Sequence, residues 1–257
     1  MCPMRAHDTD LQAVIFDVDG TLVDSERDGH RVAFNLTFEE FCLPYVWDEE
    51  LYGRLLDVTG GQRRLHLYLA GQGVGAEERE HLVPRLHDRK TELFFAMALD
   101  GKVPARPGTL RLLDSLAAAG VPVAVATTGS RAWVEPLLDR HFGLARFATL
   151  VTGDDTADRK PHPEAYVLAV QRLGVPAAAA VAVEDSDNGV RAALAAGVAV
   201  LAVTNDYTEA QDLTGAAVVA DGFGMPGHPA TARWDPAGLL AGGVVDVATL
   251  RGIVRGN

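Results

Sequence analysis

Apolar residues recur in two different patterns along this sequence, and the change of pattern divides the chain. Residues 12–16 form a short apolar run rich in β-branched side chains, which favours a buried strand over a helix. From Ser25 to about residue 104, apolar residues recur at helical spacing instead. Beyond Pro107, helical segments alternate with short apolar runs, a pattern typical of a parallel sheet covered by helices.

The block after residue 25 predicts helices only. Its first helix is expected to begin at Ser25, a residue type that caps helices, and to end at Pro44. Further helices are expected between residues 48 and 100, separated by glycines, and Pro84 is expected to begin or kink the last of them. This block therefore predicts a small all-helical domain.

The region after this block predicts the remainder of an α/β sheet. Strands are expected at 121–126, 149–152, 180–183, 198–203 and 216–220. Helices are expected at 110–119, 131–141, 163–173 and 188–196. The segment after Gly222 is rich in glycine and proline, and no element is assigned to it. The predicted fold is α/β: a Rossmann-like parallel sheet core, residues 1–24 and 105–257, with an inserted all-helical cap domain, residues 25–104.

Composition and charge narrow the class of protein. The hydrophobic fraction of 48% and the charged fraction of 23% are those of an ordinary globular protein. A net charge of -12 argues against nucleic acid as a partner, because phosphate backbones recruit basic residues. With only 2 cysteines, no signal-peptide pattern and no apolar run long enough for a membrane, a cytoplasmic location is expected. No protein partner is indicated.

Polar residues follow the predicted strands at their carboxyl ends, where open α/β sheets bind ligands. Asp17 and Asp19 follow the first strand and point to the same side, because side chains alternate along a strand. The other polar residues at strand ends or before helices are Thr127, Thr128, Lys160, Glu184 and Asp185. Four carboxylates beside a single lysine would repel one another, so a hard divalent cation with oxygen ligands, Mg²⁺, is expected as cofactor.

These groups suit phosphoryl transfer. Asp17 can attack phosphorus to form an aspartyl phosphate, and Asp19 can protonate the leaving oxygen and then deprotonate water. Thr127, the Thr128 amide and Lys160 can stabilise the charge on the transferred group. Simpler interpretations are that the aspartates form a turn, that Thr127 caps a helix and that Lys160 is solvated.

Four segments resemble, in order, the signature motifs of the haloacid dehalogenase superfamily: FDVDGTLVDS, VAVATTGS, DRKPHPEAY and VAVEDSDNG. The resemblance implies that Asp17 is the nucleophile and Asp19 the acid and base. It implies that Thr127 and Lys160 bind phosphate. The implied metal ligands are Asp17, the backbone carbonyl of Asp19, Glu184 and Asp185.

The inserted helical block is similar to the first cap class of that superfamily, which β-phosphoglucomutase and phosphoglycolate phosphatase share. Within that class, SERDGHRVAFNLTF, WDEELYGRLL, GGQRRL and TNDYTEAQDLTGAAVV resemble CbbY-type xylulose-1,5-bisphosphate phosphatases. The resemblance implies hydrolysis of a sugar phosphate, with xylulose 1,5-bisphosphate as substrate. The alternatives are a phosphosugar mutase, another small-molecule phosphatase such as phosphoglycolate phosphatase, and a phosphoacceptor switch, against which Asp19 and the cap argue.

The cap is expected to choose the substrate. The CbbY-type cap loop reads Gly-Gly-Lys-Glu-Arg, whereas this chain has Gln62 and Arg63 at the third and fourth positions. A second phosphate needs a local cation in so acidic a protein, and the candidates are Arg63, Arg64 and His30. Gly61 would let the loop approach the ligand.

The cap also contains basic residues that the sequence does not assign to substrate. Arginines on a helical cap are often solvated, which is the alternative for the candidate arginines. A second basic group, made of Arg85, His87, Arg89 and Lys90, is interpreted as a solvated helix face.

Overall fold

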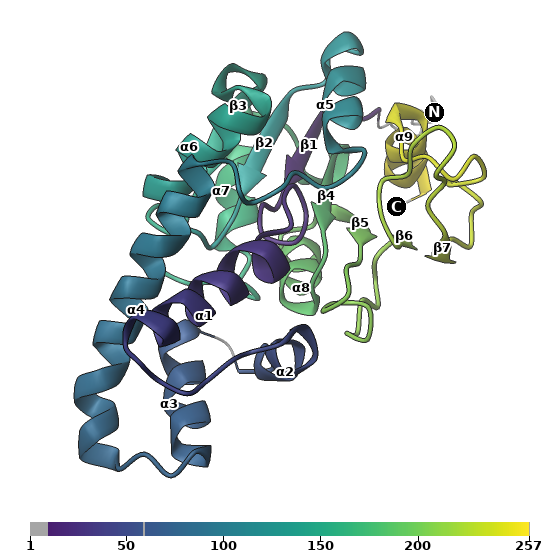
Figure 1. Cartoon of the computed structure of the whole chain (residues 1–257). Coiled ribbons are helices and arrows are strands. Elements are labelled where there is room, and N and C mark those ends of the chain that lie inside the picture. Colours follow the sequence, from purple (N-terminus) through teal and green to yellow (C-terminus); the bar gives the residue numbers. More distant parts are fainter. Residues whose placement is uncertain (1–9, 59, 257) are drawn as a thin grey trace, which may run out of the picture. The chain divides into compact units, whose positions relative to one another are not determined.

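The computed structural model describes residues 10–58 and 60–256, which fall into two compact units. One unit joins the described residues up to Val23 with the chain from Ala105 onward, and the other runs from Asp24 to Pro104. The first contains the sheet, and the second consists of helices (Figure 1). Among the described helices, none combines the length and the apolarity that crossing a bilayer requires.

The sheet unit is built on seven strands in the order β3-β2-β1-β4-β5-β6-β7. Their bounds are β1 (Ala13–Phe16), β2 (Val123–Ala126), β3 (Phe147–Val151), β4 (Ala180–Glu184), β5 (Ala199–Val203), β6 (Val218–Ala220) and β7 (Ala232–Trp234). Neighbouring strands pair in parallel as far as β6, and β7 pairs antiparallel to β6. Because β1 lies between β2 and β4, the residues that follow these three strands are neighbours.

Helices connect the strands and cover the sheet. They are α5 (Thr109–Ala118), α6 (Arg131–Phe142), α7 (Glu164–Leu173), α8 (Asp187–Ala195) and α9 (Val247–Gly256), with short 3-10 turns η2 (Leu144–Arg146) and η3 (Ala177–Ala179). Strands β1, β2 and β4 are buried at every position, as expected for parallel strands covered on both faces. Tyr166 on α7 packs fully buried into the apolar cluster beneath them.

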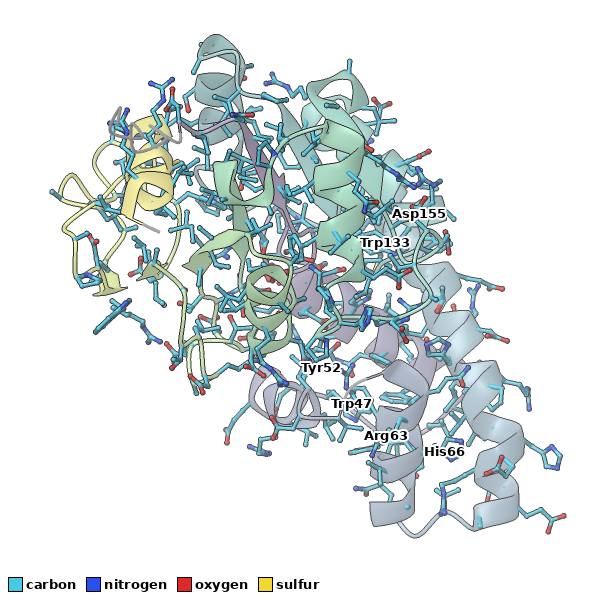
Figure 2. The ribbon with its side chains drawn as sticks, turned by 180° about the vertical axis from the view of Figure 1, so that it is seen from behind. Trp47, Tyr52, Arg63, His66, Trp133 and Asp155 are labelled. Atoms are coloured by element: carbon cyan, nitrogen blue, oxygen red, sulfur yellow. The ribbon has the colours of Figure 1, made fainter. Side chains whose placement is uncertain are left out.

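The cap unit contains the π-helical turn η1 (Glu26–His30), α1 (Arg31–Glu40), α2 (Glu49–Leu55), α3 (Gly61–Gly71) and α4 (Ala76–Leu99). Helices α1 and α3 both pack against α4. Phe34, Phe38, Trp47 and Tyr52 form its aromatic core, and Trp47 and Tyr52 are labelled in Figure 2. The ring centroids of Phe34 and Trp47 are 4.6 Å apart. Pro84 lies inside α4 rather than at its start.

Two elements lie where none was expected, in the segment after Gly222. Strand β7 pairs through its backbone, and because all its residues are exposed it has no apolar alternation to reveal it. Helix α9 buries Leu250, Ile253 and Val254 at helical spacing, and the Asp246 side chain accepts a hydrogen bond from Thr249 N near its start. The pattern of α9 is therefore legible in the sequence, although the surrounding glycines obscure it.

Candidate active site

Three carboxylates meet at the carboxyl ends of β1 and β4. The side-chain oxygens of Asp17, Glu184 and Asp185 lie within 4.8 Å of one another, and all three residues are buried. Asp17 comes directly after β1 and donates its backbone N–H to Val183 O over 3.0 Å. Strand register places Phe16 opposite Val183, so the sheet itself brings these acids together.

Lys160 lies between two of these carboxylates. Its Nζ is 2.6 Å from Asp17 Oδ1 and 2.5 Å from Glu184 Oε1, and it also donates to Ala126 O over 2.8 Å. The Lys160 side chain is 6% exposed, so little water reaches this ion pair. A single buried cation thus links the ends of β1, β2 and β4.

Burial sets the electrostatics of this cluster. It raises the pKa of Asp17 well above its usual value, and Glu184 and Asp185 raise it further, although Lys160 opposes them. Burial also raises the pKa of Asp185 to about 8, with the charge of Glu184 as the next cause. For Lys160, burial lowers the pKa, but the charges and hydrogen bonds of Asp17 and Glu184 raise it above its usual range. The cluster therefore holds more buried carboxyl groups than its lysine can neutralise, and burial disfavours their charged forms.

The other predicted core residues of the sheet unit follow β1 and β2. Asp19 lies in the turn after β1 and is partly exposed, and its backbone forms a bridge with Val23. Thr127 follows β2, is 1% exposed, and accepts a hydrogen bond at Oγ1 from Gly129 N over 3.0 Å. The Thr128 carbonyl accepts a hydrogen bond from the guanidinium of Arg159.

In the cap unit, the candidate residues fall into two groups. His30 Nδ1 lies 2.8 Å from Lys90 Nζ, and this ammonium lies over the Phe34 ring. A Cβ added at Gly61 would lie 3.5 Å from the same ring. Arg64 is 7% exposed, donates from Nε to Leu55 O over 3.0 Å, and stacks on another ring of the aromatic core. Arg63 is exposed on α3 (Figure 2).

The interpretation of Lys90 as part of a solvated helix face is wrong. Lys90 is 8% exposed, and its Nζ lies 5.0 Å and 5.2 Å from the ring centroids of Phe34 and Phe94. The position follows Leu86 by one helical turn, so Lys90 shares the buried face of α4. The four-residue spacing between Leu86 and Lys90 is visible in the sequence, but the charged residues beside Lys90 favoured the interpretation as a solvated face.

Comparison with known proteins identifies the family of this chain. The family model for haloacid dehalogenase-like hydrolases matches residues 11–197. The chain belongs to this family of hydrolases. It is 38% identical over 246 residues to the plasmid-encoded protein CbbY of Cupriavidus necator. The aligned region covers 90% of this chain and 96% of that protein.

Solved structures of CbbY from Rhodobacter sphaeroides resemble this hydrolase closely. The complex with phosphate gives a TM-score of 0.71 at 38% identity and covers 82% of this chain and 94% of the other. A mutant of the same protein, in complex with xylulose-(1,5)bisphosphate, gives a TM-score of 0.70 at 37% identity over the same shares of the two chains.

The carboxylate cluster of this hydrolase fits a hard divalent cation. Its donors are all oxygen atoms, and the cluster contains no sulfur or imidazole ligand of the kind zinc favours. Burial disfavours the charged carboxylates, and a bound dication would offset that cost. The cluster therefore provides ligands of the chemical class that Mg²⁺ takes.

Tyr166 is one residue of this site that the sequence did not predict. Its hydroxyl donates to Glu184 Oε1 over 2.5 Å, and it lies 3.4 Å from Lys160 Nζ. Glu184 Oε2 accepts from Asp185 N over 3.2 Å, so both oxygens of Glu184 are held. Tyr166 is the last residue of the third motif segment. It was not predicted to belong to the site because a tyrosine on a helix is most simply interpreted as a packing residue.

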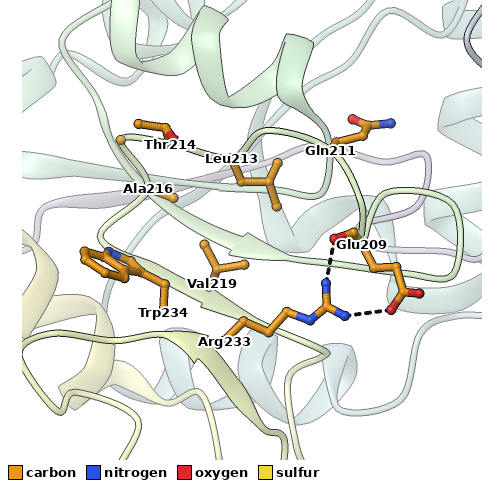
Figure 3. Close-up of a pocket in the computed structure, with 9 residues that line it drawn as sticks. Glu209, Gln211, Leu213, Thr214, Ala216, Val219, Arg233 and Trp234 are labelled. Carbon is orange, nitrogen blue, oxygen red and sulfur yellow. Dashed lines mark hydrogen bonds and ion pairs between the residues drawn. The ribbon is translucent and has the colours of Figure 1, made fainter.

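A separate cavity of about 510 Å³ lies beside β6 and β7 (Figure 3). Leu213, Val219 and Trp234 give it apolar walls, while Arg233 donates to the carboxylate of Glu209 over 2.7 Å at its edge. Its lining contains none of the residues predicted to carry the chemistry.

Proposed function

We propose that this hydrolase is a Mg²⁺-dependent phosphatase that converts xylulose 1,5-bisphosphate to xylulose 5-phosphate and phosphate. The observation that carries the proposal is the buried cluster of Asp17, Glu184 and Asp185 with Lys160 seated inside it. The choice of substrate is supported by the solved CbbY structure with a bound xylulose bisphosphate.

In this proposal Asp17 is the nucleophile. Lys160 occupies Asp17 Oδ1, which leaves Oδ2 to attack phosphorus. A new bond forms between Oδ2 and phosphorus while the phosphorus–oxygen bond to the sugar breaks. Asp19, partly exposed in the adjoining turn, donates a proton to the departing sugar oxygen.

Hydrolysis of the aspartyl phosphate completes the proposed cycle. Water attacks phosphorus while Asp19 takes its proton, so that a new phosphorus–oxygen bond forms as the bond between phosphorus and Asp17 Oδ2 breaks. This releases phosphate and restores the Asp17 carboxylate. Lys160, Thr127 and the Thr128 amide stabilise the charge on the phosphoryl oxygens. The group held by Asp17, the Asp19 carbonyl, Glu184 and Asp185 would be Mg²⁺, which when bound neutralises negative charge and orients the phosphate.

The cap cations would select the substrate by its second phosphate. His30 and Lys90 form a polar pair against Phe34 and Phe94 in the cap unit, and a Cβ added at Gly61 would lie 3.5 Å from the same Phe34 ring. A cation on an aromatic surface, partly shielded from water, interacts more strongly with phosphate than a solvated one. Arg63 and Arg64 remain candidates for the same anchor.

The test is a phosphate-release assay with Mg²⁺ on a panel of substrates. Xylulose 1,5-bisphosphate should be hydrolysed in preference to ribulose 1,5-bisphosphate, fructose bisphosphate and phosphoglycolate, and Asp17→Asn or a chelator should abolish the reaction. Faster conversion of β-glucose 1-phosphate to glucose 6-phosphate than hydrolysis would identify a mutase instead. A phosphoenzyme that persists without turnover would identify a phosphoacceptor switch.

A further inference from the structure

The side chains of Asn205 and Arg106, which are distant in sequence, both donate to the carbonyl of Gly20 in the turn that follows β1. Asn205 Nδ2 lies 2.7 Å from Asp185 Oδ2 and 3.3 Å from Gly20 O, so one amide group contacts both. Arg106 Nη1 donates to the same Gly20 carbonyl over 2.6 Å. All four residues belong to the sheet unit.

The orientation of the Asn205 amide follows from its neighbours. Asn205 Oδ1 accepts a hydrogen bond from Tyr207 N over 3.0 Å, within the loop after β5. The amide nitrogen must then face Asp185 and Gly20, because a flipped amide would oppose oxygen to oxygen and donor to donor. The local turn therefore aims the Asn205 donor at the carboxylate cluster.

Arg106 ties the loop that carries Asn205 to the turn after β1. Besides Gly20, its guanidinium donates to Val203 O over 2.9 Å and to Thr204 O over 2.6 Å. The rigid, planar fork of arginine can hold several carbonyls at once, whereas the single ammonium of lysine cannot span them in one plane. Arg106 thus fixes the backbone on both sides of the Asn205 contact.

The turn is packed directly against these groups. Gly20 has a φ of +77°, and a Cβ added there would lie 2.2 Å from Asp185 Oδ2 and 2.7 Å from Asn205 Nδ2. Only glycine fits both the backbone conformation and the space. The positions of the turn, of Asn205 and of the Asp185 carboxylate therefore depend on one another.

We propose that Asn205, held in place by Arg106, is a positioning residue that orients the Asp185 carboxylate for a divalent cation and fixes the turn that carries Asp19. By donating to Oδ2, Asn205 leaves Asp185 Oδ1 to face the cation. The inference rests on the proposed function, because it presumes that Asp185 binds a metal. Residues that orient metal ligands typically account for about a 10- to 100-fold effect on metal affinity.

The experiment compares Asn205→Ala, Asn205→Ser and Thr208→Val with the wild-type full chain. Serine keeps a side-chain oxygen for Tyr207 N but has no donor that reaches Asp185. Thr208→Val removes the hydroxyl that accepts from Asn205 N over 3.0 Å, and so perturbs the same loop while keeping the donor to Asp185. Binding of Mg²⁺ alone is measured by isothermal titration calorimetry, and the melting temperature is measured in chelator.

Both Asn205 variants should weaken Mg²⁺ binding about tenfold or more, with melting temperatures in chelator close to that of the wild type. Thr208→Val should bind Mg²⁺ as the wild type does. Wild-type affinity in Asn205→Ser overturns the inference alone, as does an equal loss in Thr208→Val. A wild type that hydrolyses sugar phosphates without binding Mg²⁺ overturns both the inference and the cofactor part of the proposed function.

Discussion

The Tyr166 hydroxyl and the Lys160 ammonium both donate to one oxygen, Glu184 Oε1, each over 2.5 Å. Glu184 is 0% exposed, so neither donor can be replaced by bulk water. Burial, with the nearby charges of Glu184 and Asp17, raises the pKa of Tyr166 well above its usual value, so the phenol remains a donor throughout the working pH range. The carboxylate is therefore held in one orientation by two groups from the segment at 160–166.

Replacing Tyr166 with phenylalanine should reveal what this bond contributes. The change removes one hydrogen bond to a buried carboxylate, so the free energy of unfolding should fall by about 1–3 kcal/mol in a urea titration. Because Lys160 still holds Glu184, kcat for phosphate release should fall without a comparable change in KM. Unchanged stability and unchanged kcat together would show that Tyr166 only fills space.

Gly189 should be intolerant of alanine although it lies in a helix. An alanine usually stabilises a helix position relative to glycine by about 1 kcal/mol. At Gly189, in α8, the added Cβ would lie 2.0 Å from the Glu184 carboxylate and would displace it. Gly189→Ala should therefore lower both the melting temperature and phosphate release.

A matched control for Gly189 lies in the cap unit. Gly71 is the last residue of α3, and a Cβ added there meets nothing within 4 Å. Gly71→Ala should leave activity unchanged and keep or raise the melting temperature. Equal effects of the two substitutions would contradict the proposed crowding at Glu184.

Asp155 should make stability depend on acid pH. Burial raises the pKa of Asp155, but hydrogen bonds from Arg172 and Thr152, with the charge of Arg131, outweigh it and hold the pKa below its usual value. Because the folded pKa is the lower one, the stabilisation is present above the unfolded pKa of about 4 and is lost as the pH falls below it. Denaturant titrations between pH 7 and pH 3 measure this loss.

Asp155→Asn should remove most of that dependence. At pH 7 the variant should lose about 2 kcal/mol of unfolding free energy, because hydrogen bonds to a charged group are replaced by weaker ones. Below pH 4 the difference between the wild type and the variant should narrow, and it should close only as the pH falls through the lower folded pKa. Asp57→Asn, at an exposed position, serves as the control and should track the wild type. Parallel curves for the wild type and Asp155→Asn would contradict the assignment.

Lys90 should affect substrate affinity rather than the chemical step. If the cation beside His30 binds the second phosphate, Lys90→Met should raise KM for the bisphosphate about tenfold or more, because a charge-assisted hydrogen bond is lost. Hydrolysis of p-nitrophenyl phosphate, which has a single phosphate, should change little. Lys102→Met removes an exposed cation of the same unit, 65% exposed at its side chain, and should alter neither reaction. Equal losses on both substrates in Lys90→Met would exclude the anchor role.

Much of the fold follows from local pattern. The strands at 180–184 and 199–203 are short apolar runs ended by glycine or polar residues, and the structure confirms the α/β class that they predict. Strand β7 could not be predicted from local pattern because its three residues are all exposed. It is recognised as a strand only by its backbone pairing with β6. The buried position of Lys90, one turn after Leu86 on α4, was missed because the charged residues beside it obscure the apolar helix face.

The sequence by itself determined that two aspartates lie together at a strand end, because side-chain alternation and strand ends are local properties. It also determined that their negative charge must be compensated by a cation. Only the tertiary structure decided which side chains contact these carboxylates and compensate their charge. Asn205 meets Gly20 across 185 positions and Lys160 meets Asp17 across 143, and such meetings depend on the order of strands in the sheet. Strand order is set by burying the whole apolar surface at once, which no single segment specifies.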